Sequence, residues 1–553
     1  MSLFEKGSCF NFVRVVVYGV VAGLLAVAFR LLLDFCYRHG IACFASFSVG
    51  EFLLYGFLCL AGTALLSAAI ARYVCGAASG SGSPQLKLLF WKDFGFSTWR
   101  VTLSKFIASV LAVGGGASLG SEGPMVLIGG TAASNVAARL GVPAHLRREA
   151  ALAGAASGLA AIFNAPLAAV AFVLEEIVGD FNSRLLGSVL IAALVGTLIS
   201  QAILGGAPLF TIPAGTGAGW ELYCCVPAVA AASTLCGLAF QWAALRVRRF
   251  SAPLTRSHFW LPALAGAFSV WAIGSAVFLL TGRLGVFFLG YDDLTAALNG
   301  DLVWWVAGTL LAAKLLATVL CYGNGACGGI FAPALFFGGT CGAALAGVLA
   351  LFLPSLGREA LMTLAVVGMC GGFATVVRAP VTAVLLVFEM THDFSMLPAL
   401  LLGVLISFSL AKYLAPRDFY DLVLDQNGES VEKFIPPRDL RAWHHLTVGR
   451  VMHEPVAVVA GTEDSSAFER LLEEHRFSYF PRIDTQGLPL GIVSRERRCL
   501  PAKTVGLEAT ILDAEQALLE QDHGVVLVVD GNGKLAGVFT LHDILRLETR
   551  FEN

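Results

Sequence analysis

Long apolar stretches, separated by short polar or glycine-rich segments, make up most of the chain before residue 430. Stretches of this kind predict helices, because about 20 apolar residues in a helix cross the hydrocarbon core of a bilayer. Several stretches are too short, or too broken by glycine and proline, to cross it cleanly. The pattern predicts helices at about 11–37, 51–75, 103–118, 148–178, 185–204, 222–247, 259–282, 302–322, 334–353, 359–373, 379–391 and 394–414.

A different pattern begins toward the C-terminus, where short apolar runs alternate with charged residues. Residues 447–500 predict the order strand, helix, strand, strand and short helix, and residues 501–553 repeat this order. In the second copy, the sequence "DGNG" is a β-hairpin turn signal. We therefore expect a membrane domain at 1–434, a linker at 435–446 and two small α/β domains after it.

Composition separates the same two parts of the chain. Of the 553 residues, 57% are hydrophobic and 14% are charged, whereas a soluble protein has about 25% charged residues. Residues 438–553 carry 31 of the charged side chains. The body is therefore expected to be an integral membrane protein with a soluble tail. The basic segment 245–256 favours the cytoplasmic side for its own loop and for the tail.

Several classes of chemistry have no signature in the sequence. The 13 cysteines are scattered, with no C-x-x-C pair and no His/Cys cluster at metal spacing, so we expect buried apolar cysteines and no metal site. No P-loop or dinucleotide fingerprint is present. We expect neither an enzyme nor a nucleic-acid partner.

The membrane body contains an internal repeat. "PMVLIGGT" (124–131) matches "PALFFGGT" (333–340), and "GLAAIFNAPLAAVAFVLEE" (158–176) matches "GFATVVRAPVTAVLLVFEM" (372–390). The repeats extend over about 50–205 and 259–414, and the residues alone leave open whether they run parallel or inverted. Duplicated, glycine-interrupted segments at matching positions indicate where a transporter binds its substrate.

Four short stretches combine glycine or proline with an expected helix start. They are "GSGSP" (80–84), "GSEGP" (120–124), "GGIFAP" (328–333) and "PRDFYD" (416–421). A helix N-terminus presents unpaired N–H groups and about half a positive charge, which suits an anion. Each stretch alone is more often a helix kink than a site. Their occurrence together in a duplicated body favours an anion pathway at these termini.

In this order, the four stretches resemble the signature motifs of the CLC family of chloride channels and chloride/proton exchangers. The resemblance covers nearly the whole chain. It implies an all-α polytopic CLC fold, an inverted repeat of about 17–18 helices, many of them broken or short. It also implies a homodimer with one anion pathway in each subunit.

By position, Ser81 resembles the serine that coordinates the central chloride ion, and Tyr420 resembles the tyrosine that closes its inner side. Ile330 and Phe331 would supply backbone N–H groups. A serine at this position favours chloride over nitrate or fluoride among the relatives. Two residues depart from the family pattern, because Ser83 stands in place of the usual isoleucine and Ser121 in place of the usual arginine or lysine.

Glu122 is the only acidic residue between Phe106 and Pro143. Its carboxylate is itself an anion, so it is able to occupy the site that its own helix terminus creates and to leave when it is protonated. We expect a gate and a proton carrier in one side chain. The alternative is a structural carboxylate that caps the helix.

Two further glutamates lie in the apolar segment "VLEEIVGD", and carboxylates inside a membrane are costly and usually functional. Glu175 aligns with Glu389 in the second repeat, which predicts a structural task common to both halves. Glu176 aligns with Met390, so it is specific to the first half. By position it resembles the internal proton-transfer glutamate of CLC exchangers.

The tail resembles a pair of CBS domains, α/β modules that often bind adenine nucleotides. In the second module, Thr540 and Asp543 match the residues that hold a ribose, whereas the first module has Arg497 in the aspartate position. At most one competent ribose clamp is therefore expected. The tail either binds one nucleotide or acts as a dimer-forming spacer.

These residues together predict a chloride/proton antiporter in the plasma or inner membrane, with multiple membrane spans and cytoplasmic CBS domains. Its partners would be chloride, protons, membrane lipid and a second copy of the chain, with no required cofactor. A passive, glutamate-gated chloride channel of the same fold is the alternative. A nucleotide-sensing scaffold with a vestigial pore is the third hypothesis.

Overall fold

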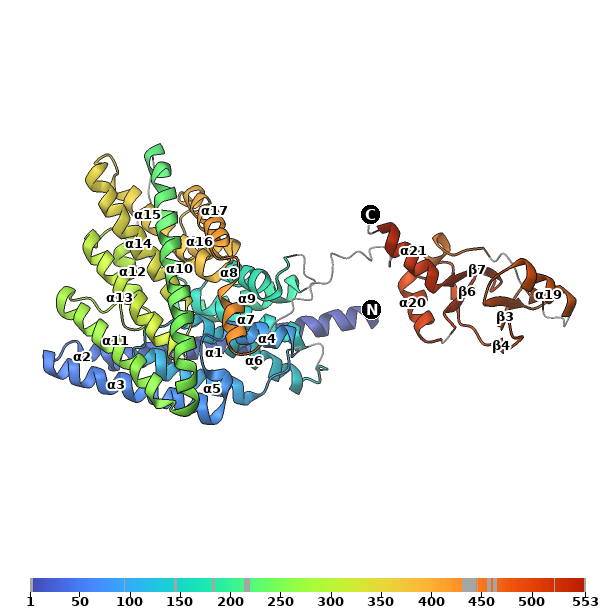
Figure 1. Cartoon of the computed structure of the whole chain (residues 1–553), viewed down its shortest axis with the longest axis horizontal. Coiled ribbons are helices and arrows are strands. Elements are labelled where there is room, and N and C mark those ends of the chain that lie inside the picture. Colours follow the sequence, from blue (N-terminus) through green and yellow to red (C-terminus); the bar gives the residue numbers. More distant parts are fainter. Residues whose placement is uncertain are drawn as a thin grey trace. The chain divides into compact units, whose positions relative to one another are not determined.

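The computed structural model describes residues 3–93, 95–143, 147–181, 185–212, 219–429, 444, 446–454, 459–460, 465–521 and 523–551. The chain divides into two compact units, Met1–Phe434 and Ile435–Asn553. The first unit is helical, and the second combines strands and helices (Figure 1). Most of the predicted linker at 435–446 lies outside the described residues.

The expectation of a polytopic all-α membrane body is confirmed. Within the described ranges, nine helices are long and apolar enough to cross a membrane, and shorter ones lie between them. The elements are α1 (Leu3–His39), α2 (Ile41–Phe44), α3 (Val49–Ala69), η1 (Ile70–Val74), η2 (Gly76–Ala78), α4 (Ser83–Trp91), α5 (Trp99–Gly114), α6 (Glu122–Arg139), α7 (Arg147–Phe163), α8 (Pro166–Phe172), η4 (Val173–Val178), α9 (Leu186–Leu204), α10 (Trp220–Ser257), α11 (Trp260–Thr281), α12 (Tyr291–Leu298), α13 (Trp304–Gly323), α14 (Phe331–Phe352), α15 (Arg358–Val377), α16 (Pro380–Thr391), α17 (Leu397–Leu414) and α18 (Phe419–Gln426).

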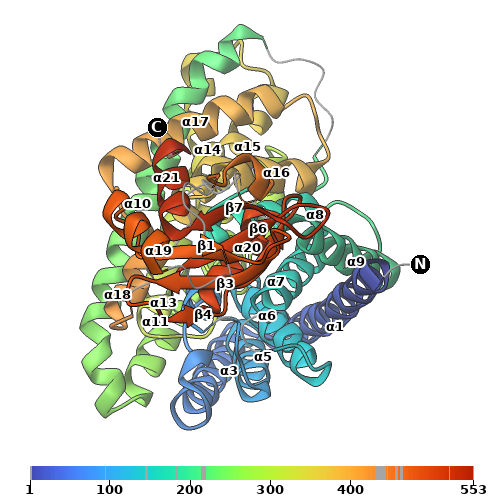
Figure 2. The same ribbon diagram turned by 90° about the vertical axis from the view of Figure 1, so that its right-hand side faces the viewer.

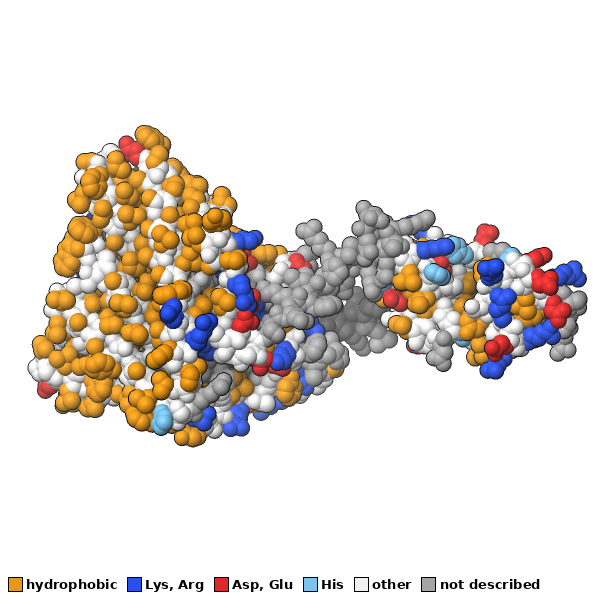
Figure 3. Space-filling model, viewed as in Figure 1, with side chains coloured by type: hydrophobic (Ala, Val, Ile, Leu, Met, Phe, Trp, Pro, Cys, Tyr) orange, Lys and Arg blue, Asp and Glu red, His pale blue; other side chains and the backbone are white. Residues whose placement is uncertain are grey.

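The surface of this unit is suited to lipid. Hydrophobic side chains cover most of the face shown in Figure 3, and charged side chains gather along one margin. Large apolar residues stand exposed on several helices, such as Leu194 and Leu198 on α9 and Leu405 on α17. A continuous apolar surface of this kind is stable in hydrocarbon and unstable in water.

One helix predicted from the sequence, 148–178, is in fact three elements, α7, α8 and η4. The break lies at Asn164, whose φ of 55° is left-handed, and Pro166 then begins α8. Proline in a helix interior removes a hydrogen bond and clashes with the preceding turn. The second repeat breaks in the same way, with Arg378 at φ 64° before Pro380.

The two repeats meet through a pair of equivalent glycines. The offset that aligns Pro124 with Pro333 also aligns Gly120 with Gly329. Each glycine N–H donates to the other's carbonyl oxygen at 2.7 Å, which makes an antiparallel bridge. Equivalent segments therefore run in opposite directions where the halves meet. In Figures 1 and 2 the first-half helices, blue to teal, lie together, as do the green to orange helices of the second half.

Two fully buried lysines obey the same symmetry. Lys105 of α5 aligns with Lys314 of α13 by the offset that aligns the glycines. Lys105 Nζ donates to the carbonyl oxygens of Ala78 and Gly80 at 2.9 and 2.5 Å. Lys314 Nζ donates to two carbonyls of the loop before α12, at 3.2 and 2.6 Å. Each ammonium thus fixes the loop that leads into a short helix.

The predicted structural task shared by Glu175 and Glu389 is confirmed. The Glu175 carboxylate accepts the backbone N–H groups of Val381 and Thr382, in the first turn of α16, at 3.1 and 2.9 Å. The Glu389 carboxylate accepts those of Leu167 and Ala168, in the first turn of α8, at 3.0 and 2.8 Å. Each half therefore caps a helix of the other half, and α8 and α16 pack antiparallel.

The second unit repeats one topology. In the first copy β1 pairs parallel to β2, and β2 pairs antiparallel to β3; in the second, β5 pairs parallel to β6, and β6 antiparallel to β7. The short helix expected after β3 is wrong, because a turn leads there into a two-residue strand, β4. The elements are η6 (Val448–Arg450), β1 (Val459–Ala460), α19 (Ser465–Glu474), β2 (Tyr479–Ile483), β3 (Pro489–Ser494), β4 (Cys499–Leu500), β5 (Thr504–Gly506), α20 (Ile511–Leu519), β6 (Val525–Val529), β7 (Leu535–Thr540) and α21 (Leu541–Phe551).

The reciprocal caps predict a loss of stability on substitution. Glu389→Ala removes the acceptor of two N–H groups at the start of α8, and a lost cap costs about 0.5–2 kcal/mol. We expect a lower thermal midpoint for the purified protein in detergent. Asp301→Ala is the control, since this exposed carboxylate pairs with the exposed Arg358 and such surface pairs contribute little. Equal losses in the two variants would contradict the capping role.

Candidate functional site

The three glycine motifs predicted to form helix starts meet inside the first unit. The α-carbon of Gly123 approaches Ser81 so closely that a β-carbon there would lie 2.6 Å from the serine hydroxyl oxygen and 3.1 Å from the Gly329 α-carbon. Gly82, at φ 110°, approaches the Gly123 carbonyl in the same way. Only glycine permits this contact, so the N-termini of α4 and α6 and the segment leading into α14 lie side by side.

Glu122 is the first residue of α6 and is fully buried. Its Oε1 accepts a hydrogen bond from the Tyr291 hydroxyl at 2.7 Å and one from the Ser121 hydroxyl at 3.3 Å. The carboxylate also faces the backbone N–H groups of Glu122 itself and of Ala332, in the first turns of α6 and α14. It therefore occupies the position between two helix N-termini where an anion is favoured.

Ser81 and Tyr420 are buried, and among the described residues their hydroxyl groups have no hydrogen-bond partner. The Ser83 hydroxyl shares this property and lies close to Tyr420, because α18 packs against α4. Buried hydroxyls without a partner are costly unless a polar ligand satisfies them. Ile330 and Phe331 are also buried, at the start of α14, where the first N–H groups lack an intrahelical acceptor.

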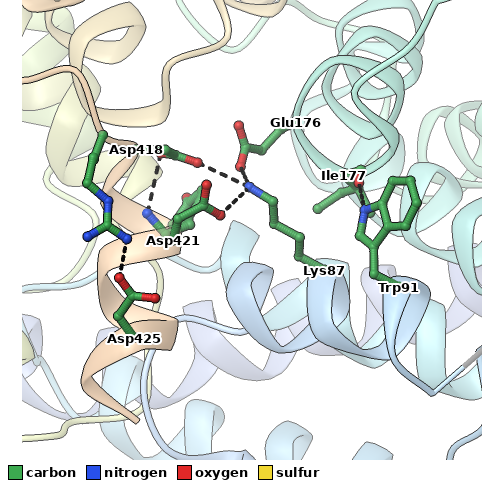
Figure 4. Close-up of polar contacts among 9 residues, drawn as sticks. Lys87, Trp91, Glu176, Ile177, Asp418, Asp421 and Asp425 are labelled. Carbon is green, nitrogen blue, oxygen red and sulfur yellow. Dashed lines mark hydrogen bonds and ion pairs between the residues drawn. The ribbon is translucent and has the colours of Figure 1, made fainter. Parts of the chain in front are cut away.

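Glu176 belongs to a buried ionic cluster that the sequence did not reveal (Figure 4). The Lys87 ammonium lies 2.8 Å from Glu176 Oε1, 3.2 Å from Asp418 Oδ2 and 2.8 Å from Asp421 Oδ1. Asp418 caps α18 by accepting the backbone N–H of Tyr420 at 3.3 Å. The predicted proton-transfer residue is thus joined, through one lysine, to the helix that carries Tyr420.

The solvent exposure of the side chains increases across the cluster. The side chains of Lys87 and Glu176 are 0% and 5% exposed, whereas that of Asp421 is 36% exposed. One ammonium faces three carboxyl groups, so the group is closest to charge balance when carboxyl groups hold protons. A chain of this kind can take a proton from water and pass it inward.

Two cavities with different lining residues lie next to the site. One, of about 510 Å³, is lined by Ser121 and Tyr291, next to Glu122. The other, of about 620 Å³, is lined by Ser79, two residues before Ser81, and by residues of α10 and α18. The first cavity retains basic side chains although Ser121 is neutral. These are Arg30, Arg38 and Arg283, together with the acidic Asp34, Asp292 and Asp293.

The two residues of the predicted ribose clamp lie together in the second unit, but they are already engaged. Asp543 Oδ2 accepts the N–H and the hydroxyl of Thr540 at 2.9 and 2.8 Å. Asp543 Oδ1 lies 2.9 Å from His453 Nε2. His453 reaches this position because its backbone bridges Val538 of β7. In the first copy, Arg497 contacts Glu469 instead.

Sequence reasoning missed five residues of the membrane site. Lys87 lies on α4, the helix that begins within "GSGSP". Asp418 and Asp421 lie on either side of Tyr420 within "PRDFYD". Their closeness in sequence to the motifs could have identified all three as residues of the site. For Tyr291 and Ala332 the sequence gave a weaker indication of a role in the site. Tyr291 begins α12 as Ser83 begins α4, each directly after a glycine with positive φ.

Comparisons with known proteins match both units. The family model "Voltage gated chloride channel" matches residues 62–412, and the "CBS domain" model matches residues 499–549. The H(+)/Cl(-) exchange transporter ClcA of Yersinia pseudotuberculosis is 30% identical over 431 residues, which are 76% of this chain and 88% of that protein. The ClcA of Salmonella typhimurium is 29% identical over 433 residues, 75% of this chain and 89% of the relative.

Solved structures show the same fold. A slow cyanobacterial Cl-/H+ antiporter superimposes with a TM-score of 0.68 at 26% identity, over 75% of this chain and 97% of that one. A eukaryotic CLC transporter superimposes with a TM-score of 0.62 at 18% identity, over 96% of this chain and 97% of that one. The second match extends over nearly the whole chain and supports the fold alone.

The buried cluster predicts a large effect of Lys87→Met. Removing the ammonium leaves three carboxyl groups without their cation, and breaking a buried pair costs about 3–5 kcal/mol. We expect a marked loss of thermal stability at neutral pH. The loss should shrink as the pH falls, because protonation removes the uncompensated negative charge.

Lys92→Met is the matched control, because Lys92 is 57% exposed and contacts Glu429 at the surface. It should change the melting temperature little at any pH. Similar, pH-independent losses in the two variants would show that Lys87 does not balance the buried carboxylates.

Proposed function

The chain belongs to the voltage gated chloride channel family, whose model matches residues 62–412, and we propose that it exchanges chloride for protons across a membrane. The observation that carries the proposal is the Glu122 carboxylate, which lies between the N-termini of α6 and α14. A side-chain anion in that position competes directly with a transported anion. The relatives named as H(+)/Cl(-) exchange transporters support the choice of chloride and protons.

Chloride binding is proposed at the helix termini next to Glu122. The Ser81 and Tyr420 hydroxyls, buried and without partners among the described side chains, would donate to the ion. The backbone N–H groups of Ile330 and Phe331 would add the partial positive charge of α14. A site built from such dipoles binds an anion without a full countercharge, so the ion is able to leave again.

Proton movement is proposed to use two glutamates. Ionised Glu122 occupies the pathway; protonated, it loses its charge and leaves the position to chloride. Glu176 would deliver protons from the inner side, since Lys87 connects it to the half-exposed Asp421. The two carboxyl groups lie on different elements, α6 and η4, so water or a side-chain movement must complete the path between them.

Reconstitution into liposomes tests the exchange. With a chloride gradient imposed, we expect the protein to drive protons uphill, which a pH-sensitive dye in the vesicles records. Glu176→Gln should abolish proton movement and spare chloride flux, because the amide cannot carry a proton. Glu122→Gln should remove both the proton movement and the pH dependence of chloride flux.

Asp301→Asn, a change in an exposed carboxylate, should leave proton pumping at the wild-type level. Chloride flux without any proton movement in the wild type would establish the passive channel instead. An absence of flux would support the scaffold hypothesis.

We propose that the second CBS domain binds an adenine nucleotide through Thr540 and Asp543. His453 lies against Asp543, so a ribose would displace it to reach the carboxylate. Calorimetric titration of the full chain with ATP, ADP and AMP tests this. We expect binding of at least one nucleotide and at least tenfold weaker binding in Asp543→Ala; three flat titrations would leave the tail as a structural spacer.

A further inference from the structure

Tyr291 is a buried phenol in direct contact with Glu122, and the sequence motifs gave it no role. Its hydroxyl donates to Glu122 Oε1 at 2.7 Å, the shortest hydrogen bond that the structure gives this carboxylate. We propose that Tyr291 is a positioning residue that holds the ionised Glu122 side chain across the anion pathway. The inference rests on the proposed gating function of Glu122.

The surroundings of Tyr291 fix the phenol in place. Gly290, at φ 78°, precedes it in a turn so tight that a β-carbon would lie 2.5 Å from the Gly285 carbonyl oxygen. Lys314 holds the same loop through its bond to the Phe288 carbonyl at 2.6 Å. The Phe210 ring packs edge-on against Tyr291, with centroids 5.6 Å apart. A donor held this rigidly loses little entropy when it binds the carboxylate.

A comparison of the two repeats shows that the contact between Tyr291 and Glu122 has no equivalent in the first half. Tyr291 begins α12 as Ser83 begins α4, and the glycines before them both have positive φ. Ser83 is short and lies near Tyr420, whereas Tyr291 is long enough to reach the first residue of α6. Of the first residues of these two short helices, Tyr291 places a donor on Glu122, whereas Ser83 lies near Tyr420 instead.

The chemistry of the contact favours one state of the gate. A hydroxyl that donates to an ionised carboxylate makes a stronger bond than one that donates to a neutral carboxyl group. Tyr291 therefore stabilises the ionised side chain in its blocking position and opposes its protonation. Because the phenol is neutral, it holds the side chain without adding a charge that would trap chloride.

Other charged groups also surround this contact. Arg30 on α1 acts on Tyr291 electrostatically, and Arg283 is paired with Asp293 at 3.1 Å. The remaining charged groups that line the adjoining cavity are Asp34 and Arg38 of α1 and Asp292 of α12. All of them stay in place when only the Tyr291 hydroxyl is removed, so Tyr291→Phe isolates the contact.

Chloride efflux from liposomes, measured against pH, tests the role of Tyr291. In Tyr291→Phe we expect the pH midpoint of activation to move about one unit toward alkaline values, the effect of losing a hydrogen bond to a charged group. At neutral pH the flux should rise several-fold, because Glu122 leaves the pathway more readily. An unchanged midpoint would overturn the proposal. Tyr291→Leu, which also lacks the hydroxyl, provides the measurement if the phenylalanine variant does not fold.

Two controls separate positioning from a general structural effect. Tyr37→Phe removes a phenol hydroxyl from the same cavity without touching Glu122, and it should leave the midpoint unchanged. In a Glu122→Gln background, Tyr291→Phe should cause no further change in the pH profile. An equal shift from Tyr37→Phe, or a shift that persists without Glu122, would overturn the proposal.

Chloride binding in detergent distinguishes a failure of this inference from a failure of the proposed exchange. If Tyr291 holds Glu122 against chloride, Tyr291→Phe should bind chloride roughly tenfold more tightly by calorimetry. Equal affinities would overturn the inference, whatever the wild type transports. If the wild type moved chloride without protons, the proposed exchange would be refuted. The comparison of chloride affinities between the wild type and Tyr291→Phe would still test the role of Tyr291.

Discussion

The structure depends on two backbone hydrogen bonds between Gly120 and Gly329. An anion in an apolar interior needs positive potential, and a full lysine or arginine charge beside it would hold it too strongly. The paired glycines solve this by bringing the starts of α6 and α14 together, so that helix dipoles supply the potential. Glycine is required at the contacts, because a β-carbon at Gly123 or Gly329 would overlap the opposing backbone.

The residues with proposed functional roles differ between the two repeats, whereas the structural residues are shared by both. The elements common to both halves are structural: the buried Lys105 and Lys314, the Pro-initiated helices and the reciprocal glutamate caps. The proposed functional residues have no like counterpart. Glu122 aligns with Phe331, and Glu176 aligns with Met390. A duplicated scaffold thus brings equivalent helix N-termini together, and in the proposed mechanism the single-copy side chains provide the gate and the proton route.

Much of this was accessible from the sequence. Apolar patterning gave most of the long helices, and the glycine motifs gave the starts of α4, α6 and α14, because composition and chain breaks are local properties. The Lys87 cluster and the Tyr291 contact were not accessible, because they join residues that are 89, 169 or 331 positions apart. No local pattern encodes the packing that brings such residues together. The break at Asn164 was missed because an apolar run conceals a change of direction when both parts are buried. The helix α12 is only eight residues long, too short to give a periodic signal.

The reciprocal caps also bear on how the protein is made. Leu167 and Ala168 lie in the first half, and the Glu389 carboxylate that accepts their N–H groups lies more than two hundred positions later. During synthesis the start of α8 therefore enters the bilayer without its cap and waits until almost the whole membrane unit has been translated. The start of α8 therefore gains its cap only after α16, a helix of the second half, has been made.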